Sequence, residues 1–290
     1  MFTNPFEGLR ESPALLIALT GLLGLLIGSF LNVVILRLPR MMEWTWRRDA
    51  REILGLEAVA ETRVTLLRPA SCCPQCSAMI KPWHNVPLLG WLMLRGRCAT
   101  CSAPISAQYP LIEASSAVLA GLCAWHFGYG AALLAALVLS WTLLALAVID
   151  LRTQLLPDDL TLPLLWLGLA LSFVPVFAGV HDAVIGAIAG YLSLWSIYWL
   201  FKLVTGREGM GYGDFKLLAA LGAWLGWQAL PSIILLSSVV GAGVGIGLIV
   251  FRRHDRQIPI PFGPYLAAAG WLAMMIGEPL GSLYTRLLTP

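Results

Sequence analysis

The sequence predicts an all-α polytopic membrane protein, and two observations support this fold class. Hydrophobic residues make up 58% of the chain, charged residues only 12%, and the mean hydropathy is +0.78. Such a composition is typical of an integral membrane protein and not of a soluble domain with a large core. The apolar residues also gather in long segments separated by short polar ones, as expected for helices that cross a bilayer.

The first predicted transmembrane helix covers residues 13–36. Its 24 residues would reach about 36 Å at 1.5 Å per residue, enough to span a hydrocarbon core of about 30 Å. The segment is too long for the core of a signal peptide, and no small-residue cleavage site follows it, so residues 1–36 are expected to form a retained N-terminal anchor. Asn32 is expected to hydrogen-bond to another helix.

A hydrophilic segment, residues 37–107, follows the anchor and is long enough to fold as a subdomain. It contains two CxxC pairs separated by 21 residues, and each pair can form a knuckle whose two thiolates face one ion. The pattern predicts a tetrahedral zinc site, with two disulfides or a redox CxxC as alternatives. Four cysteines would fill every coordination position, so the metal is expected to be structural. The predicted ligands are Cys73, Cys76, Cys98 and Cys101.

Seven further apolar segments follow Gln108, so the sequence predicts about eight transmembrane helices with the zinc-binding subdomain between the first and the second. Glu113 is a carboxylate early in the second apolar segment, so burial is expected; an interfacial position and a role in a site are both open. Pro261, Pro264 and Gly270 weaken the helical pattern of the last segment. The seven segments are residues 109–127, 131–149, 160–178, 183–204, 215–230, 233–251 and 261–276.

The distribution of basic residues predicts the orientation in the membrane. Seventeen of the 19 Lys and Arg residues fall in loops on the side of the Cys segment, and only Arg10 and Arg286 fall on the other side. The positive-inside rule therefore places the Cys segment in the cytoplasm and both termini outside. A reducing cytoplasm argues against disulfides and favours zinc. The tryptophans and arginines of residues 44–48 are typical of a patch near anionic headgroups, so membrane lipid, and no nucleic acid, is the expected partner.

An aspartate interrupts the apolar pattern in residues 209–216, Gly-Met-Gly-Tyr-Gly-Asp-Phe-Lys, where the sixth helix begins. Moving Asp into the centre of a membrane helix costs about 2.5 to 3.5 kcal/mol, so Asp214 is a candidate functional residue. Gly211 and Gly213 would let the backbone turn sharply and let another chain approach the carboxylate. A glycine-rich turn with a helix-capping Asp is the alternative interpretation.

Asp150 is a candidate partner for Asp214, because it ends the third apolar segment on the same predicted membrane face. Two nearby carboxyl groups do not ionise together easily, so one keeps a proton while the other acts as a base. Such a pair can activate water and donate a proton to an amide leaving group. The alternative is an ordinary helix-ending loop, in which Asp158 and Asp159 cap the next helix. The residues predicted to support the pair are Gly211, Gly213, Lys216 and Glu113.

Several motifs occur in a characteristic order: GSFLNVVILRLP (residues 28–39), the two CxxC pairs, WLMLRGRC (91–98), YPLIE (109–113), IDLRTQLLPDDLTLP (149–163) and GMGYGDFK (209–216). With these motifs nearly the whole chain resembles the type IV prepilin peptidases, a family of GxGD aspartic proteases. The resemblance implies that Asp150 and Asp214 are the catalytic aspartates. It also implies a bacterial inner-membrane location.

The resemblance further implies two activities. One is cleavage of the short basic leader of type IV prepilins and type II secretion pseudopilins after a glycine, at the cytoplasmic face. The other is methylation of the new N-terminal amine with S-adenosylmethionine. Residues 37–107 would be associated with methylation, and residues 108–290 would form the peptidase bundle. The sequence has no strand, GxGxxG and helix unit that would identify the residues binding S-adenosylmethionine.

Two other classes of function are compatible with parts of the sequence. A proton-coupled transporter could use Asp150, Asp214 and Glu113 as a proton relay. Against it, the two aspartates lie at one membrane face and not at the midplane, and no internal repeat is visible. A noncatalytic assembly factor could dock partners through the zinc subdomain. Cleavage of a prepilin would separate the peptidase from both.

Overall fold

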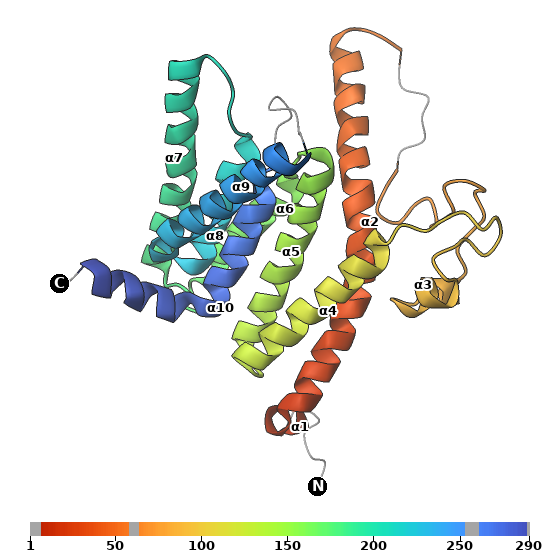
Figure 1. The fold of residues 1–290 in the computed structure, drawn as a ribbon, viewed down its shortest axis with the longest axis horizontal. Coiled ribbons are helices and arrows are strands. Elements are labelled where there is room, and N and C mark those ends of the chain that lie inside the picture. The colour runs from red at the N-terminus through yellow and green to blue at the C-terminus, as the bar shows by residue number, and fades with distance from the viewer. Residues whose placement is uncertain (1–6, 58–63, 253–260, 289–290) are drawn as a thin grey trace. The chain divides into compact units, whose positions relative to one another are not determined.

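The computed structural model describes residues 7–57, 64–252 and 261–288, which form helices and no strand (Figure 1). This confirms the all-α prediction. The chain divides into two compact units, Met1–Leu133 and Leu134–Pro290. The predicted anchor, the Cys segment and the second predicted helix thus fall within one unit. The helices of that unit are α1 (Glu7–Glu11), α2 (Pro13–Ile53), η1 (Pro82–Asn85), α3 (Leu89–Met93) and α4 (Gln108–Phe127).

Helix α2 is longer than the predicted anchor. Ser12 caps its N-terminus, where the Leu15 backbone N–H donates to the Ser12 hydroxyl at 3.4 Å, and Pro13 occupies the first turn. The helix then continues through Pro39 to Ile53, for 41 residues in all. At 1.5 Å per residue it reaches about 60 Å, roughly twice the thickness of a hydrocarbon core. The predicted end at residue 36 marks the end of the apolar stretch and not the end of the helix.

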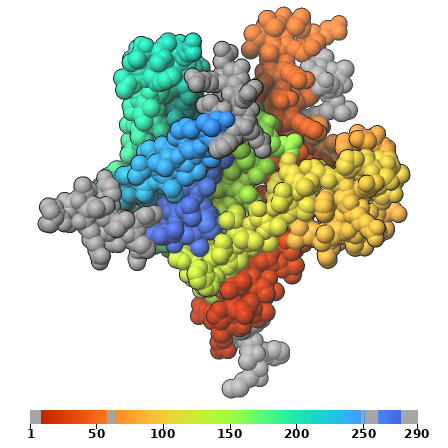
Figure 2. Space-filling view, in the orientation of Figure 1, coloured from red at the N-terminus to blue at the C-terminus, as the bar shows by residue number. Residues whose placement is uncertain are grey.

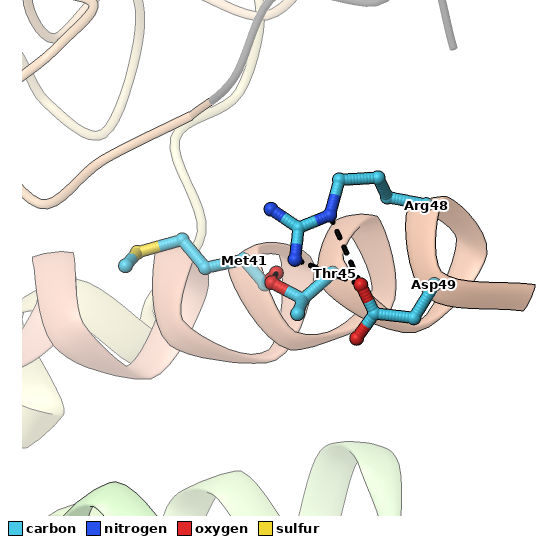
Figure 3. Close-up of polar contacts among 4 residues, drawn as sticks. All are labelled: Met41, Thr45, Arg48 and Asp49. Carbon is cyan, nitrogen blue, oxygen red and sulfur yellow. Dashed lines mark hydrogen bonds and ion pairs between the residues drawn. The ribbon is translucent and has the colours of Figure 1, made fainter. Parts of the chain in front are cut away.

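The polar extension of α2 satisfies its side chains locally (Figure 3). The Thr45 hydroxyl donates to the Met41 carbonyl at 3.0 Å, one turn back. The Arg48 guanidinium donates twice to Asp49 Oδ1, at 3.0 and 2.8 Å, and lies over the ring of Trp44. Exposed ion pairs of this kind contribute little stability.

Helices α2 and α4 pack closely along each other. A Cβ on Gly24 or Gly28 would lie 2.7 Å from a backbone Cα of α4, so only glycine permits this approach. The Ser116 hydroxyl of α4 donates to the Gly24 carbonyl at 2.5 Å. The Asn32 side-chain amide donates to the Tyr109 carbonyl at 3.1 Å, which confirms the predicted hydrogen bond between helices.

Residues 64–107 contain little regular structure besides η1 and α3. In the space-filling view their yellow-orange atoms form a separate lobe at one end of α4 (Figure 2). The lobe holds both CxxC pairs, so the cysteines lie on a small subdomain that is attached to the packed pair α2 and α4.

The second unit contains the other predicted helices, but two are shorter than predicted. Helices α6 and α8 have 14 residues each, or about 21 Å, less than a hydrocarbon core. Pro175 follows the end of α6, and Gly226, with a φ of +82°, ends α8. The helices are α5 (Ala131–Thr153), α6 (Asp158–Leu171), α7 (Val180–Thr205), α8 (Tyr212–Leu225), η2 (Trp227–Ala229), α9 (Leu230–Arg252) and α10 (Gly263–Leu288).

Four stretches among the described residues are long and apolar enough to cross a membrane: α2, α5, α7 and residues 227–247, which include most of α9. The chain is therefore a membrane protein. The eight helices of 14 or more residues among the described residues overlap the eight predicted segments.

Helix α8 lies at the core of the second unit, where it packs against α6, α7 and α10 (Figure 1). All its residues from Leu217 to Trp224 are buried. A Cβ on Gly186 of α7 or on Gly222 of α8 would lie 2.2 Å from the other residue's carbonyl oxygen, so the two backbones touch. The Trp224 indole donates to the Leu164 carbonyl of α6 at 2.7 Å. These contacts fix α8, whose first turn carries Asp214.

Candidate active site and metal centre

Asp150 lies near the C-terminal end of α5, and its side chain is held by a backbone group of α10. The residue is buried, and its Oδ2 accepts a hydrogen bond from the Gly263 N–H at 3.0 Å. A Cβ on residue 263 would lie only 2.7 Å from that oxygen. Glycine at this position therefore lets the backbone approach the carboxylate closely enough to donate to it.

Asp214 lies in the first turn of α8, directly after the glycine-rich turn. It is buried, its N–H donates to the Gly211 carbonyl at 3.3 Å, and its Oδ1 has no hydrogen-bond partner among the described residues. Gly211 is the N-cap residue and is extended, with φ −81° and ψ 147°. A buried carboxylate oxygen at a helix N-terminus can accept hydrogen bonds from a ligand or from water.

The structure brings the two aspartates into one site. Their carboxyl groups are close enough for their charges to interact. Leu156 lies next to Gly213, which precedes Asp214, and next to Gly263, which donates to Asp150. Its Cδ1 would lie 3.2 Å from a Cβ added to either glycine. A side chain on either glycine would displace Leu156. The predicted pairing of Asp150 with Asp214 therefore has a structural basis, built from α5, α8 and α10.

Two residues of this site, Gly263 and Leu156, were missed by the sequence analysis. The available signal was the run Pro261-Phe262-Gly263-Pro264, in which a glycine between prolines marks a constrained turn. The same prolines also weaken the helical pattern of the last apolar segment, which hides the signal. Leu156 carries no polar group and has no sequence signal of its own.

Lys216, predicted as a supporting residue, contacts Asp158 and not the aspartate pair. Its ammonium donates to both carboxylate oxygens of Asp158 at 2.7 Å. The prediction that Asp158 and Asp159 cap the fourth helix is wrong, because Pro157 occupies the N-cap position and both aspartates lie inside the first turn of α6. The ion pair joins the first turn of α6 to the first turn of α8.

Glu113, the other carboxylate predicted to support the site, lies in the first unit on α4. It is buried, and its Oε2 accepts a hydrogen bond from the Leu88 N–H at 2.7 Å. Its hydrogen-bond partner thus belongs to the Cys-bearing segment.

The four predicted metal ligands converge. Their sulfur atoms all lie within 4.8 Å of one another, with Cys73 Sγ 3.8 Å from Cys101 Sγ and Cys76 Sγ 4.0 Å from Cys98 Sγ. A disulfide would require about 2.05 Å. A tetrahedral zinc ion with Zn–S bonds of about 2.3 Å places its sulfurs about 3.8 Å apart. The donor set and its spacing therefore fit zinc better than disulfides. Cys72 and Cys123 lie outside this cluster.

The two knuckles share one backbone geometry. The Cys73 N–H donates to the Ala78 carbonyl at 2.9 Å, and the Cys98 N–H donates to the Ala103 carbonyl at 2.8 Å. The serine that follows each pair has a positive φ, 56° at residue 77 and 58° at residue 102. The short repeat Cys-x-x-Cys-Ser-Ala could have signalled this symmetry in the sequence.

The second knuckle also favours a thiolate. Backbone N–H groups of Cys101 and Thr100 point to the sulfur of Cys98 and lower the pKa of this thiol to about 6. Because the thiolate is the form that binds a metal, this knuckle is prepared for a cation.

Comparisons with known proteins match both units. The family described as bacterial peptidase A24 N-terminal domain matches residues 22–127, and the type IV leader peptidase family matches residues 137–246. The chain is 54% identical over 279 residues, 96% of each chain, to a prepilin leader peptidase/N-methyltransferase of Pseudomonas aeruginosa. It is 57% identical over 274 residues, 94% of each chain, to the protein of that name from Aeromonas hydrophila. No solved structure matches the chain.

Proposed function

Because the chain belongs to the type IV leader peptidase family, we propose that Asp150 and Asp214 are the acid and base with which it cleaves prepilin leaders. The chain is an aspartic endopeptidase that removes the leader of prepilins and an N-methyltransferase that acts on the exposed N-terminus. The observation that carries the assignment of residues is the pair of buried carboxyl groups, whose supporting glycines Gly213 and Gly263 both lie against Leu156.

The geometry supports a two-carboxylate mechanism. One carboxylate takes a proton from a water molecule, which attacks the carbonyl carbon of the scissile peptide bond. The other carboxyl group donates its proton to the nitrogen of the departing amide. The Gly263 N–H holds Asp150 in place, and the N-terminus of α8 presents Asp214. Both groups are thus oriented before substrate arrives, which lowers the cost of reaching the transition state.

The position of both aspartates at helix ends supports a proposal for the substrates and for the topology. Both aspartates lie at helix ends next to polar loops, and a prepilin has a polar leader followed by an apolar helix. The bond between these two parts would lie near the membrane surface, where helix ends of this kind are expected. The excess of basic residues on this side supports a cytoplasmic active site in the bacterial inner membrane, with both termini in the periplasm. Type IV prepilins and type II secretion pseudopilins are the proposed substrates.

The Cys-bearing segment is the part we assign to methyl transfer, with S-adenosylmethionine as the methyl donor. Cys73, Cys76, Cys98 and Cys101 would hold zinc, which when bound supplies a crosslink between the two knuckles and leaves no open coordination position. The role of these four side chains is therefore to hold the shape of the segment.

The proposed function is tested with the purified full-length chain, a prepilin and mass spectrometry. With no addition, the product should have lost the leader. With S-adenosylmethionine added, the mature product should also gain the mass of one methylene group. A prepilin whose mass stays unchanged in both reactions would contradict the proposal and favour the alternative function of a proton-coupled transporter.

A further inference from the structure

Glu113 is a buried carboxylate that the cleavage mechanism does not use. Its Oε2 accepts the Leu88 N–H at 2.7 Å across 25 positions of sequence. Leu88 has a φ of +58° and a ψ of −51°, a backbone conformation that residues other than glycine rarely adopt. Leu88 is also the N-cap residue of α3. The carboxylate therefore satisfies the amide of an unfavourable turn from which α3 starts.

Helix α3 in turn supports the second cysteine knuckle. The Trp91 indole of α3 donates to the Ile105 carbonyl at 3.2 Å, and its ring lies 2.8 Å from the Cβ position of Gly96. The Ile105 N–H donates to the Gly96 carbonyl at 2.7 Å. These contacts enclose the knuckle that begins at Cys98. The direction of α3 therefore determines where this knuckle lies.

On its other side, Glu113 is fixed to the membrane helices. Its Cα lies 2.7 Å from the Cβ position of Gly28, in the close contact between α2 and α4. The residue thus connects a rigid helix pair to the turn that starts α3.

We propose that Glu113 is a positioning residue for methyl transfer: by accepting the Leu88 N–H, its carboxylate sets the position of α3 and the second knuckle on the helix pair α2 and α4. This inference rests on the proposed assignment of methyl transfer to the Cys-bearing segment. It assigns no role to Glu113 in cleavage, because the bonds described involve only the first unit.

The test compares Glu113→Ala and Glu113→Gln in the full-length protein, with cleavage, methylation and bound metal measured on the same preparations. Alanine removes the acceptor and leaves the part-buried Leu88 N–H without its partner, so methylation should slow by at least about tenfold. Cleavage should stay within about twofold of wild type, since the Glu113–Leu88 bond belongs to the first unit and both aspartates belong to the second. Glutamine keeps an acceptor oxygen, so Glu113→Gln should retain most of the methylation.

A second variant covers the case in which Glu113→Ala is poorly folded. Leu88→Gly removes the cost of the positive φ, so adding it to Glu113→Ala should restore a large part of the methylation. Amide hydrogen exchange adds a direct readout, because the Leu88 amide should exchange faster in Glu113→Ala and not in Glu113→Gln.

Three results would overturn the inference. They are full methylation by Glu113→Ala, a loss in Glu113→Gln as large as in Glu113→Ala, and an equal loss of cleavage and methylation that Leu88→Gly does not restore. A wild-type protein that cleaves but does not methylate would instead contradict the proposed function, and the inference would fall with it.

Discussion

At the scale of single residues, the site depends on two glycines, whose lack of a side chain leaves room for close contacts. A Cβ added to Gly213 or to Gly263 would lie 3.2 Å from Leu156 Cδ1. Gly263 also donates its N–H to Asp150. The aspartates themselves could be predicted from the sequence because charge inside apolar segments is rare. The glycine of α10 could not, because its function comes from a contact with a residue 113 positions away.

Gly263→Ala tests this contact. The new methyl carbon would lie 2.7 Å from Asp150 Oδ2, so the carboxylate must move. We expect cleavage to slow by at least about tenfold, because displacements of about 1 Å can cost up to a hundredfold in rate. Gly243→Ala is the matched control, since nothing lies within 4 Å of its Cβ position. Equal activity of the two variants would show that the Gly263 contact does not position Asp150.

At the scale of elements, the site combines the short helix α8 with the long helices α5 and α10. Helices α6 and α8 have 14 residues each, and the Lys216–Asp158 ion pair joins their first turns. Hydropathy predicts all eight described helices of 14 or more residues, but their ends depend on turns and on side-chain pairing. The end of α2 at Ile53 was missed because the extension is charged. The predicted capping role of Asp158 is wrong because Pro157 occupies the N-cap position, and the Asp158 carboxylate pairs with Lys216 of α8.

Replacing Lys216 tests whether the ion pair positions α8. Lys216→Met should lower cleavage a few-fold, while the free energy of unfolding changes by less than about 1 kcal/mol, because the pair is partly exposed. Lys216→Arg keeps a cation and should behave as wild type in the same cleavage and denaturation measurements. If Lys216→Arg and Lys216→Met were equally impaired, the loss would have to come from something other than the charge.

At the scale of the whole molecule, the two units coincide with the two matching families. Residues 22–127 lie within the first unit and residues 137–246 within the second. The first unit holds the cysteine cluster and the second holds the aspartate pair. The proposed assignment of one reaction to each unit rests on the resemblance and not on hydropathy, because no periodicity in the sequence marks which unit carries which reaction.

Removing one metal ligand tests this division. Cys98→Ser should lower the bound zinc well below one ion per chain and slow methylation, because three thiolates hold zinc less firmly than four. Cleavage should fall much less, since the aspartates lie in the other unit. Cys72→Ser is the control, because this exposed thiol lies outside the cluster. Elemental analysis and the two activity assays check the result; undiminished zinc in Cys98→Ser would contradict a four-cysteine site.

The central claim, that Asp150 and Asp214 act as one acid–base pair, is tested most directly by prepilin cleavage with single asparagine variants. Asp150→Asn and Asp214→Asn should each lower the rate by about 10² to 10⁴, the usual contribution of a general acid or base. Asp159→Asn, an exposed aspartate in the first turn of α6, should cleave at the wild-type rate. Cleavage that persists at the wild-type rate in either Asp150→Asn or Asp214→Asn would contradict the mechanism.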